Sequence, residues 1–318
     1  MAMVVVCGEA LMDVFALADT ATGMALEARI GGSPFNVAVG LARLGQPVAF
    51  LGAIAKDFLG ERLVRALREE GVDTSTVVRV DAPTTLGLVG LDAQGVASYS
   101  FYGEGGADRQ LPADALQRVP PTVTAIHVGS FAMVVEPIAS TLRALVEREH
   151  ERILVSYDPN VRLNVDPDLT RWRDALEWML TRAHVMKISE EDLGLLHPGV
   201  SATDFIDRAL ARGVRLVVVT RGASGAVART ASRGAAVSAP AVPVVDTVGA
   251  GDAFQSALLA WLGEHDALRI EAIAPGTETR LEEGLRFACT AASVVCSRRG
   301  ADLPTRAEIA STSPVTGA

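Results

Sequence analysis

A carboxylate beside two glycines is the feature of this chain best suited to chemistry. The residues Asp246-Thr247-Val248-Gly249-Ala250-Gly251-Asp252-Ala253-Phe254 lead into an apolar stretch with helical spacing. Free N–H groups at a helix start, with the positive end of the helix dipole, attract phosphate-like anions, and glycine lets such a ligand approach the backbone. Asp252 would take a hydroxyl proton while these amides hold the charge of a transferring phosphoryl group. The alternative is that Asp252 only caps the helix.

Residues 31–45 and 156–162 place further polar groups where a helix begins or a strand ends. In the first segment, two glycines and Ser33 precede an apolar helical stretch, although a capped loop explains the same residues. The second segment, Ser156-Tyr157-Asp158-Pro159-Asn160-Val161-Arg162, follows an apolar strand at the edge where open α/β sheets bind ligands. Arg162 is suited to hold phosphate oxygens there, but a single loop arginine is usually solvated.

Three other positions carry weaker signals for a ligand site. The segment Thr220-Arg221-Gly222-Ala223-Ser224-Gly225 closes an apolar strand with glycines, which a tight hairpin to residues 226–229 explains equally well. The pair Asp108-Arg109 follows a glycine-rich loop and either reaches a polar ligand or forms a surface pair. Asp13, just after the first apolar stretch, is more typical of a turn than of a ligand site.

Composition limits the classes of protein to which this chain can belong. Its 318 residues carry a net charge of −9, which disfavours nucleic acid as a partner. The N-terminus has no basic leader and no apolar run long enough to enter a membrane. The 3 cysteines lie far from CxxC spacing and indicate a reducing, cytoplasmic setting, and the 5 scattered histidines disfavour zinc. P-loop and protein-kinase motifs are absent from the sequence, so we expect a soluble enzyme that binds phosphate at helix starts.

Short apolar stretches alternate with amphipathic ones, which predicts an α/β fold with a mostly parallel central sheet flanked by helices. The predicted strands are the N-terminal run to Cys7 and residues 48–54, 125–128, 153–157, 185–188 and 216–220, with a strand end at 241–245. The predicted helices are residues 35–44, 60–70, 138–149, 204–212, 253–262 and 281–297. Residues 311–318 are expected to form a frayed tail.

Residues 14–30 and 84–102 interrupt this alternation. Both stretches alternate polar and apolar positions and contain turn signals such as Asp92-Ala93-Gln94-Gly95. The pattern predicts a small antiparallel β-sheet outside the α/β body, with ordinary edge strands as the alternative. A sheet that covers the site would keep water away from a transferring phosphate, so we interpret these segments as a lid.

Together these motifs resemble the PfkB, or ribokinase-like, family of sugar kinases. Residues 246–254 match the C-terminal signature of the family and residues 31–45 match its N-terminal signature, in order and at the typical separation. The resemblance extends from residue 4 to about residue 304, and residues 32–38, 101–102, 107–109, 156–162 and 187–192 are most similar to fructokinases. It implies one ribokinase-like kinase domain over residues 1–318, with lid segments at about 14–31 and 84–111.

The resemblance also implies which residues act in ATP-dependent phosphorylation of a sugar hydroxymethyl group. The catalytic set would be Asp252 as the base, Gly249, Ala250 and Gly251 as the anion hole, and Arg162. The sugar side would consist of Asp13, Gly32, Asn36, Phe101, Arg109, Asn160 and Asp252. The nucleotide side would consist of Ser189, Thr220, Gly222, Gly225, Gly249 and Gly251, with the helix at residues 288–297 near adenine.

Metal ions and a second copy of the chain also follow from the resemblance. Mg²⁺ is implied together with ATP, but the family's Asn-x-x-Glu segment aligns with Ser189-Glu190-Glu191-Asp192, which leaves Asp192 an indirect role at the metal. Some members bind K⁺ beside the anion hole, and Asp246 and Val248 occupy the matching positions. Members often form homodimers through the lid.

Fructose, converted to fructose 6-phosphate, is the substrate that the resemblance favours. A 2-keto-3-deoxygluconate kinase is the nearest alternative, because the carboxylate of that substrate would pair with Arg109 and Arg162. Ribokinase-type and nucleoside kinases come next. A catalytically silent sugar-binding homologue is the last alternative, and it would have no need of a base at Asp252.

Overall fold

An eight-stranded sheet forms the centre of the protein, which a computed structural model describes for residues 2–91, 97–273 and 280–312. Its strands are β1 Met3–Cys7, β4 Val48–Leu51, β9 Val123–Gly129, β10 Leu154–Asp158, β11 Val185–Ser189, β12 Leu216–Thr220, β13 Ala226–Arg229 and β14 Gly234–Val237. They lie in the order β14-β13-β12-β11-β10-β9-β1-β4. All neighbours from β4 to β12 pair in parallel, and β13 and β14 close the sheet as antiparallel strands. The predicted α/β fold is confirmed.

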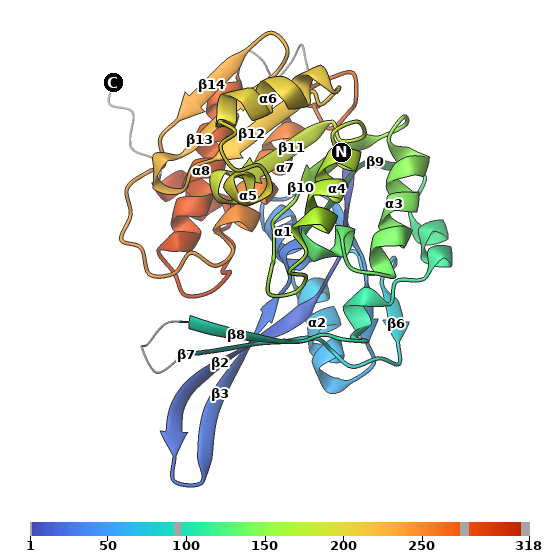
Figure 1. Ribbon diagram of the computed structural model, residues 1–318, viewed down its shortest axis with the longest axis vertical. Helices are drawn as coiled ribbons and strands as arrows, with labels where there is room; N and C mark the ends of the chain where they lie inside the picture. Colours follow the sequence, from blue (N-terminus) through green and yellow to red (C-terminus); the bar gives the residue numbers. More distant parts are fainter. Residues whose placement is uncertain (1, 92–96, 274–279, 313–318) are drawn as a thin grey trace.

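Helices cover both faces of the central sheet, each over its own apolar core (Figure 1). One face carries α1 Ser33–Arg43, α2 Phe58–Glu69, α7 Ala250–Glu264, α8 Leu281–Cys296 and α9 Arg306–Thr312. The other carries α3 Ile138–Glu149, α4 Leu169–Met179, α5 Glu190–Leu196 and α6 Ala202–Ala211. Along β1, Val4 and Val6 face the first core while Val5 and Cys7 face the second. Because both faces are covered, the strands have continuous apolar sequences.

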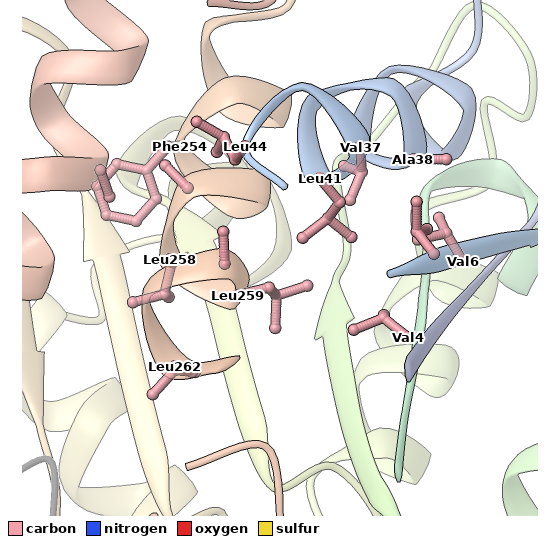
Figure 2. Packing of buried hydrophobic residues seen from close by; sticks show 14 of the residues in the cluster. Val4, Val6, Val37, Ala38, Leu41, Leu44, Phe254, Leu258, Leu259 and Leu262 are labelled. Carbon is pink, nitrogen blue, oxygen red and sulfur yellow. The ribbon is translucent and has the colours of Figure 1, made fainter. Parts of the chain in front are cut away.

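Helices α1 and α7 pack closely against each other, which joins residues 31–45 to residues 246–254. Figure 2 shows Val37, Ala38 and Leu41 of α1 and its C-cap Leu44 near Phe254, Leu258, Leu259 and Leu262 of α7, with Val4 and Val6 of β1 beside them. At Gly40, an added Cβ would overlap Ser256 Oγ on α7, so this approach requires glycine. The packing therefore fixes the position of one helix relative to the other.

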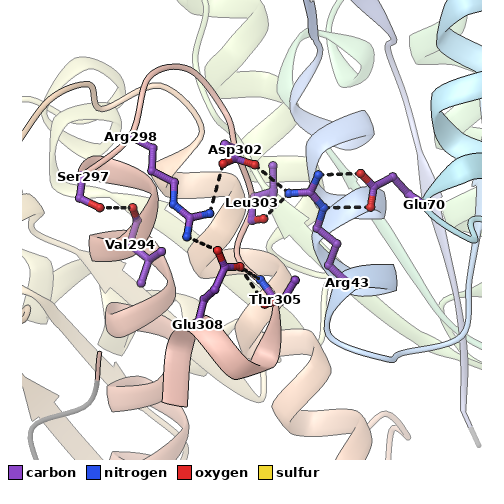
Figure 3. Close-up of polar contacts among 9 residues, drawn as sticks. All are labelled: Arg43, Glu70, Val294, Ser297, Arg298, Asp302, Leu303, Thr305 and Glu308. Atoms are coloured by element: carbon purple, nitrogen blue, oxygen red, sulfur yellow. Dashed lines mark hydrogen bonds and ion pairs between the residues drawn. The ribbon is translucent and has the colours of Figure 1, made fainter. Parts of the chain in front are cut away.

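Ion pairs fasten the C-terminal segment to the end of α1 (Figure 3). Arg43 binds Glu70 through two hydrogen bonds of 2.6 and 2.9 Å and binds Asp302 at 2.9 Å. Arg298, just after α8, pairs with both Asp302 and Glu308. These contacts hold the chain after α8 beside α1, and thus next to the turn that precedes α7.

A second, four-stranded sheet lies beside the body and is called the lid sheet below. Its strands are β2 Leu11–Thr20, β3 Gly23–Gly31, β7 Leu86–Leu91 and β8 Ala97–Tyr102, in the order β3-β2-β7-β8. Each hairpin is antiparallel, as predicted, but β2 and β7 pair in parallel. The hairpin β2–β3, blue in Figure 1, extends away from the body. The turn signal predicted at residues 92–95 lies outside the described residues.

The structure corrects two of the predicted strands. The segment 48–54 forms two strands, because β5 Ala53–Ala55 leaves β4 and pairs with β6 Val78–Val80. The break falls at Gly52, where a Cβ would lie 2.5 Å from the carbonyl oxygen of Gly8. Residues 241–245, all of which the structure describes, form no strand and are mostly exposed. The prediction of a strand end there was wrong, because an apolar run without a partner strand does not form a ladder.

Three of the described α-helices, α4, α5 and α9, were absent from the predictions. Helix α4 begins at Asp168, whose carboxylate accepts the N–H of Thr170 at 2.9 Å, and its buried Trp172 and Leu176 follow helical spacing. Helix α5 has only 7 residues, and its first turn carries the acidic side chains of Glu190, Glu191 and Asp192. The predicted tail at 311–318 is wrong at residues 311 and 312, which belong to α9, and residues 313–318 lie outside the described residues. Among the described helices, none is long and apolar enough to cross a membrane.

Candidate active site

A cavity of about 540 Å³ lies between the lid sheet and the starts of α1 and α7. It brings together Asp13, Gly32, Asn36, Phe101, Asn160, Arg162, Val248, Gly249, Gly251 and Asp252, all of which the sequence singled out. The ionisable side chains in its lining are those of Glu9, Asp13, Arg162, Glu191 and Asp252. Four of these five are acidic, so the part of the cavity away from residues 247–252 is suited to a polar ligand group without a negative charge of its own.

The Asp252 carboxylate is held by two side chains from the start of α1. Its Oδ1 accepts a hydrogen bond from Ser33 Oγ at 2.6 Å, and its Oδ2 accepts one from Asn36 Nδ2 at 2.8 Å. Asp252 is only 6% exposed, and burial raises the pKa of its carboxyl, although both hydrogen bonds act in the opposite direction. A raised pKa improves a carboxylate as a proton acceptor. Because both oxygens bond to α1, the interpretation of Asp252 as a mere cap of α7 is disfavoured.

The turn at residues 247–252, called the anion turn below, presents backbone N–H groups at the start of α7. Gly249 has a φ of 80°, and a Cβ there would lie 2.5 Å from a side-chain carbon of the segment after α8. Ala250 donates its N–H to the carbonyl of Thr247 at 3.2 Å. In the described part of the chain, the N–H groups of Gly249, Gly251 and Asp252 have no backbone acceptor. These amides, at the positive end of the α7 dipole, are suited to hold an anion.

Asp13 reaches the cavity from β2 of the lid sheet. It is flanked by Gly31 on β3 and Gly87 on β7, and a Cβ on either glycine would crowd the Asp13 carboxylate. This space for a carboxylate favours a ligand role over the turn interpretation of Asp13. Burial raises the pKa of Asp13 to about 6, although the charge of Arg162 lowers it. Above that pH, Asp13 is a carboxylate that accepts hydrogen bonds from ligand hydroxyl groups.

The loop after β10 contributes Asn160 and Arg162. Asn160 has a φ of 41°, and its buried Nδ2 has no hydrogen-bond partner in the described part of the chain. Arg162 is exposed and donates a hydrogen bond to the carbonyl of Val161 at 2.9 Å. Its charge lowers the pKa of both Asp13 and Asp252. Because Asn160 and Arg162 both line the cavity, a bound ligand would give their N–H groups acceptors.

Sequence reasoning missed Glu9, Ser130 and Phe131, which also line the cavity. Glu9 follows β1 at the carboxyl edge of the sheet, is 1% exposed, and has a pKa that burial raises to about 8. Its Oε2 has no hydrogen-bond partner among the described residues. Phe131 packs edge-on against Phe101 of the lid sheet, with ring centroids 5.7 Å apart. An acidic residue directly after the first strand was the available signal for Glu9.

A buried ion pair lies next to the anion turn, and the sequence gave no indication of it. Lys187 of β11 donates to Asp158 Oδ2 of β10 at 2.7 Å, and both side chains are 3% exposed. A Cβ at Gly251 would lie 3.1 Å from Lys187 Nζ. The ammonium therefore borders the anion turn at Gly251.

The predicted nucleotide residues outside the anion turn lie at the ends of β11 and β12. Ser189 and Thr220 pair in register there, and Ser189 caps α5 by accepting the N–H of Asp192 at 2.9 Å. Gly222 and Gly225 have φ values of 52° and 85° in the hairpin that joins β12 to β13. The hairpin explanation thus accounts for both glycines. These four residues are not part of the cavity lining, and their nucleotide role stays a prediction.

The two carboxylates predicted near metal ions bind backbone amides. Asp192 Oδ1 accepts the N–H of Val161 at 3.2 Å, and burial raises the pKa of Asp192. Asp246 accepts the N–H groups of Val248 at 3.0 Å and Gly300 at 2.8 Å. Over the residues that the structure describes, no group of three His, Cys, Asp or Glu side chains is placed to hold a metal ion. Both carboxylates therefore shape the loops around the site.

Arg109 is the predicted sugar-side residue that the structure does not bring into the cavity. It ends the short helix η1 Ala107–Arg109, and a Cβ at Gly103 would lie 2.9 Å from its Nη2. Its neighbour Asp108 is buried and accepts the hydroxyl hydrogen of Thr85, so Asp108-Arg109 is not an exposed surface pair. A contact between Arg109 and a sugar stays a prediction.

A buried carboxylate beside a helix start with free N–H groups, under a separate lid sheet, is the arrangement of an α/β enzyme that transfers phosphoryl groups to small hydroxyl compounds. The comparison with known families agrees with this class. The model of the pfkB family of carbohydrate kinases matches residues 1–308, and the chain belongs to that family. It is a carbohydrate kinase.

Individual relatives are similar over nearly the whole chain. A fructokinase of Rhizobium leguminosarum bv. trifolii is 34% identical over 282 residues, covering 89% of this chain and 86% of that protein. The fructokinase of Xylella fastidiosa, solved with bound ATP, superimposes with a TM-score of 0.84 at 28% identity and covers 98% of this chain and 97% of its own. The fructokinase of Vibrio cholerae, solved with fructose, ADP and calcium, gives a TM-score of 0.82 at 28% identity and covers 98% of this chain and 99% of its own.

Proposed function

We propose that this chain is an ATP-dependent fructokinase that phosphorylates fructose to fructose 6-phosphate. The observation that carries the proposal is the Asp252 carboxylate, buried in the cavity and oriented by Ser33 and Asn36 at the edge of the anion turn. A protein that only bound sugar would have no use for a proton acceptor next to an anion site. The fructokinases with 28–34% identity to this chain support the choice of substrate.

The residues of the site suit a direct transfer between ATP and a sugar hydroxyl. Asp252 accepts the proton of the hydroxyl group, whose oxygen forms a bond to the γ-phosphorus while the bond from that phosphorus to the β-phosphate oxygen breaks. Ser33 and Asn36 keep the carboxylate in one orientation during this step. The N–H groups of Gly249, Gly251 and Asp252 hold the charge on the moving phosphoryl group, and ADP leaves.

The rest of the cavity suits the other hydroxyl groups of the sugar. Asp13 and Glu9 offer carboxyl oxygens, and Asn160 offers an N–H donor that has no partner in the described part of the chain. Phe101 and Phe131 form an apolar wall that can cover the carbon face of the ring. The lid sheet closes one side of the cavity, which limits access of water to the phosphate.

Charge separates fructose from the nearest alternative substrate. A 2-keto-3-deoxygluconate molecule carries a carboxylate, and the cavity lining offers it Arg162 as a cation against the acidic side chains of Asp13, Glu191 and Asp252. Glu9 does not add to this repulsion, because its pKa is raised to about 8. Arg109, the second cation that this substrate would use, lies outside the lining. Repulsion from the carboxylates therefore favours a neutral sugar.

Mg²⁺ fits the site as an ion held mainly by phosphate oxygens and water. The buried Oδ1 of Asp158 has no hydrogen-bond partner in the described part of the chain. The negative charge of Asp158 also raises the pKa of Asp192. These two residues would orient the water shell of Mg²⁺, which neutralises phosphate charge when bound. Neighbours solved with calcium or potassium ions alongside fructose and ADP support the use of metal ions, with K⁺ beside Asp246 and Val248 as part of the proposal.

A homodimer formed through the lid sheet and a cytoplasmic setting complete the proposal. Leu17, Met24 and Leu26 of the β2–β3 hairpin are 58%, 58% and 54% exposed, which is unusual for three large apolar side chains on one hairpin. A second lid sheet would cover them. All three cysteines are free thiols, as expected in a reducing compartment.

An assay of ADP release over a panel of sugars tests the proposal. Purified protein with ATP and Mg²⁺ is incubated with fructose, 2-keto-3-deoxygluconate, ribose and glucose, and kcat/KM is measured for each. Fructose is expected to give the highest value, with product confirmed as the 6-phosphate. A higher kcat/KM for 2-keto-3-deoxygluconate would reassign the substrate, and no turnover of any sugar would favour a silent binding protein.

A further inference from the structure

Lys187 and Asp158 form a buried ion pair whose hydrogen bonding is incomplete. An ammonium has three N–H donors, and Lys187 uses one of them, on Asp158 Oδ2. The other carboxylate oxygen, Asp158 Oδ1, has no partner in the described part of the chain. A pair that serves stability alone normally has its remaining donors and acceptors satisfied, because burial of unpaired charge is costly. Lys187 thus has donors left for a ligand.

The ammonium of Lys187 borders the part of the site where a phosphate would approach. A Cβ at Gly251 would lie 3.1 Å from Nζ, so glycine at this position leaves the charge next to the anion turn. The positive charge of Lys187 also acts on the base, since it lowers the pKa of Asp252. Lys187 is the only buried lysine or arginine among the described residues.

The choice of lysine at this position is itself informative. The chain contains two lysines, Lys56 and Lys187, among 29 lysines and arginines. Lys56 is 51% exposed and pairs with the exposed Asp81, whereas Lys187 is 3% exposed. Arginine is thus the usual cation of this chain, and the buried lysine is the one that lies between Asp158 and Gly251. A compact point charge fits there.

We infer that Lys187 is a catalytic residue whose ammonium binds the oxygens of the transferring phosphoryl group from the Gly251 side, while Asp158 positions it. This inference rests on the proposed function, because it requires phosphoryl transfer at the anion turn. The backbone amides of the turn contribute partial charges, and Lys187 adds a full positive charge that needs no movement during the reaction. Its effect is therefore expected on kcat more than on the sugar KM.

Four variants separate this role from that of a structural ion pair. Lys187→Met should lower kcat about 100-fold or more and change the sugar KM less than about threefold. Lys56→Met, which removes the exposed lysine, is the matched control and should retain the parent kcat. Asp158→Asn measures what the carboxylate contributes by itself. The double variant Lys187→Met/Asp158→Asn removes both charges and so restores the melting temperature that Lys187→Met loses.

The double variant decides between the two roles. A restored melting temperature with kcat still at least tenfold below that of Asp158→Asn, measured at saturating Mg²⁺, supports the inference. A double variant whose kcat equals that of Asp158→Asn would overturn it and leave a structural ion pair. If the double variant does not fold, the comparison of Lys187→Met with the parent applies: a folded Lys187→Met protein with parent kcat would overturn the inference as well.

An NMR experiment tests the contact without turnover. Protein labelled with ¹³C at the lysine ε-carbon gives two lysine signals, which Lys187→Met and Lys56→Met assign. Addition of Mg²⁺, ADP and aluminium fluoride, which imitate the transferring phosphoryl group, should shift the Lys187 signal and leave the Lys56 signal in place. An unshifted Lys187 signal with bound nucleotide contradicts the inference. A shift in a protein that phosphorylates no sugar would instead keep the phosphate contact and reject the proposed function.

Discussion

The central sheet and the lid sheet differ in how firmly packing holds their residues. In the central sheet, β10 is buried along its whole length, and β11 and β12 are buried except at their last residues. In β2 of the lid sheet, Leu11 and Met12 are buried, but residues 16–20 are exposed. In the proposed function, the central sheet and its helices would position the groups of the chemical step, while the lid sheet would offer groups that meet the sugar. Substitutions in the body should change turnover, and substitutions in the lid should change sugar affinity.

Asp252→Asn should produce the largest effect and acts on the body side of this comparison. The amide cannot accept the sugar proton, so kcat is expected to fall roughly 10³-fold. The side chain keeps its size and its place beside Ser33 and Asn36, so the affinities for sugar and ATP should stay near those of the parent. Steady-state kinetics and calorimetric titration measure both quantities. Near-parent turnover in a folded variant would remove Asp252 as the base.

Gly251→Val should follow with a loss in kcat of about 100-fold, comparable to removal of an oxyanion donor. Its Cβ would lie 3.1 Å from Lys187 Nζ, and the branched side chain would cover the anion turn. Gly194→Val on α5 is the matched control, because no neighbouring atom lies within 4 Å of its Cβ position. Equal kcat values for the two folded variants would contradict the proposed phosphate contact at the anion turn.

Asp13→Asn tests the lid side and should raise the sugar KM about tenfold, a loss of about 1.4 kcal/mol, with kcat nearly unchanged. The pKa of Asp13 is raised to about 6, so the parent carboxylate becomes protonated as the pH falls through that value. The parent KM should therefore rise below about pH 6, and the KM of Asp13→Asn should not follow. A KM profile that stays parallel to that of the parent would assign the titration to another group.

Arg109→Ala provides the matched comparison within the same region. Arg109 lies against Gly103 and not in the cavity lining, so its removal is expected to raise the sugar KM less than Asp13→Asn does. A tenfold rise in the sugar KM of Arg109→Ala, with unchanged ATP affinity, would instead show that Arg109 reaches the sugar in the complex.

Glu9→Gln should have the smallest effect, on stability. Burial raises the pKa of Glu9 from 4.5 to about 8, so the folded state binds a proton that the unfolded state releases between these values. This contribution to the free energy of unfolding is complete below pH 4.5 and is lost as the pH rises through 8. The melting temperature of Glu9→Gln should therefore decline less than that of the parent between pH 5.5 and 8.5. Equal declines in scanning calorimetry would mean that Glu9 stays ionised.

The sequence predicted the body better than the lid because the body follows local rules. Strands covered on both faces are continuous apolar runs. Helices α1 and α7 begin at glycine turns, and a few neighbouring residues are enough to predict such a helix start. The structure places Asp252, Gly249 and Gly251 in one cavity lining, and their catalytic roles stay a prediction. Ala250 shows the limit of such reasoning, because only the fold reveals that its N–H bonds to Thr247.

Residues whose role depends on neighbours distant in sequence were harder to predict. Asp13 was placed on the sugar side only by the family resemblance, and the local pattern favoured a turn residue. The glycines that make room for it, Gly31 and Gly87, lie on two other strands. In the sequence, Lys187 and Asp158 stand only as members of two separate segments. Their pairing depends on β10 and β11 being adjacent in the sheet. For Asp13, Lys187 and Asp158, the information lies in strand order, which a local pattern does not contain. Glu9 offered a single local signal, an acidic residue after the first strand.

The contact between Gly40 and Ser256 has a consequence for redesign of this enzyme. Because α1 and α7 touch there without room for a Cβ, the start of α1, which orients the base, and the start of α7, which carries it, form one block. A library that aims at a new sugar should leave both helices intact and vary the lid strands around Asp13, Leu88 and Phe101. Those positions reshape the cavity wall and leave the alignment of the reacting groups unchanged.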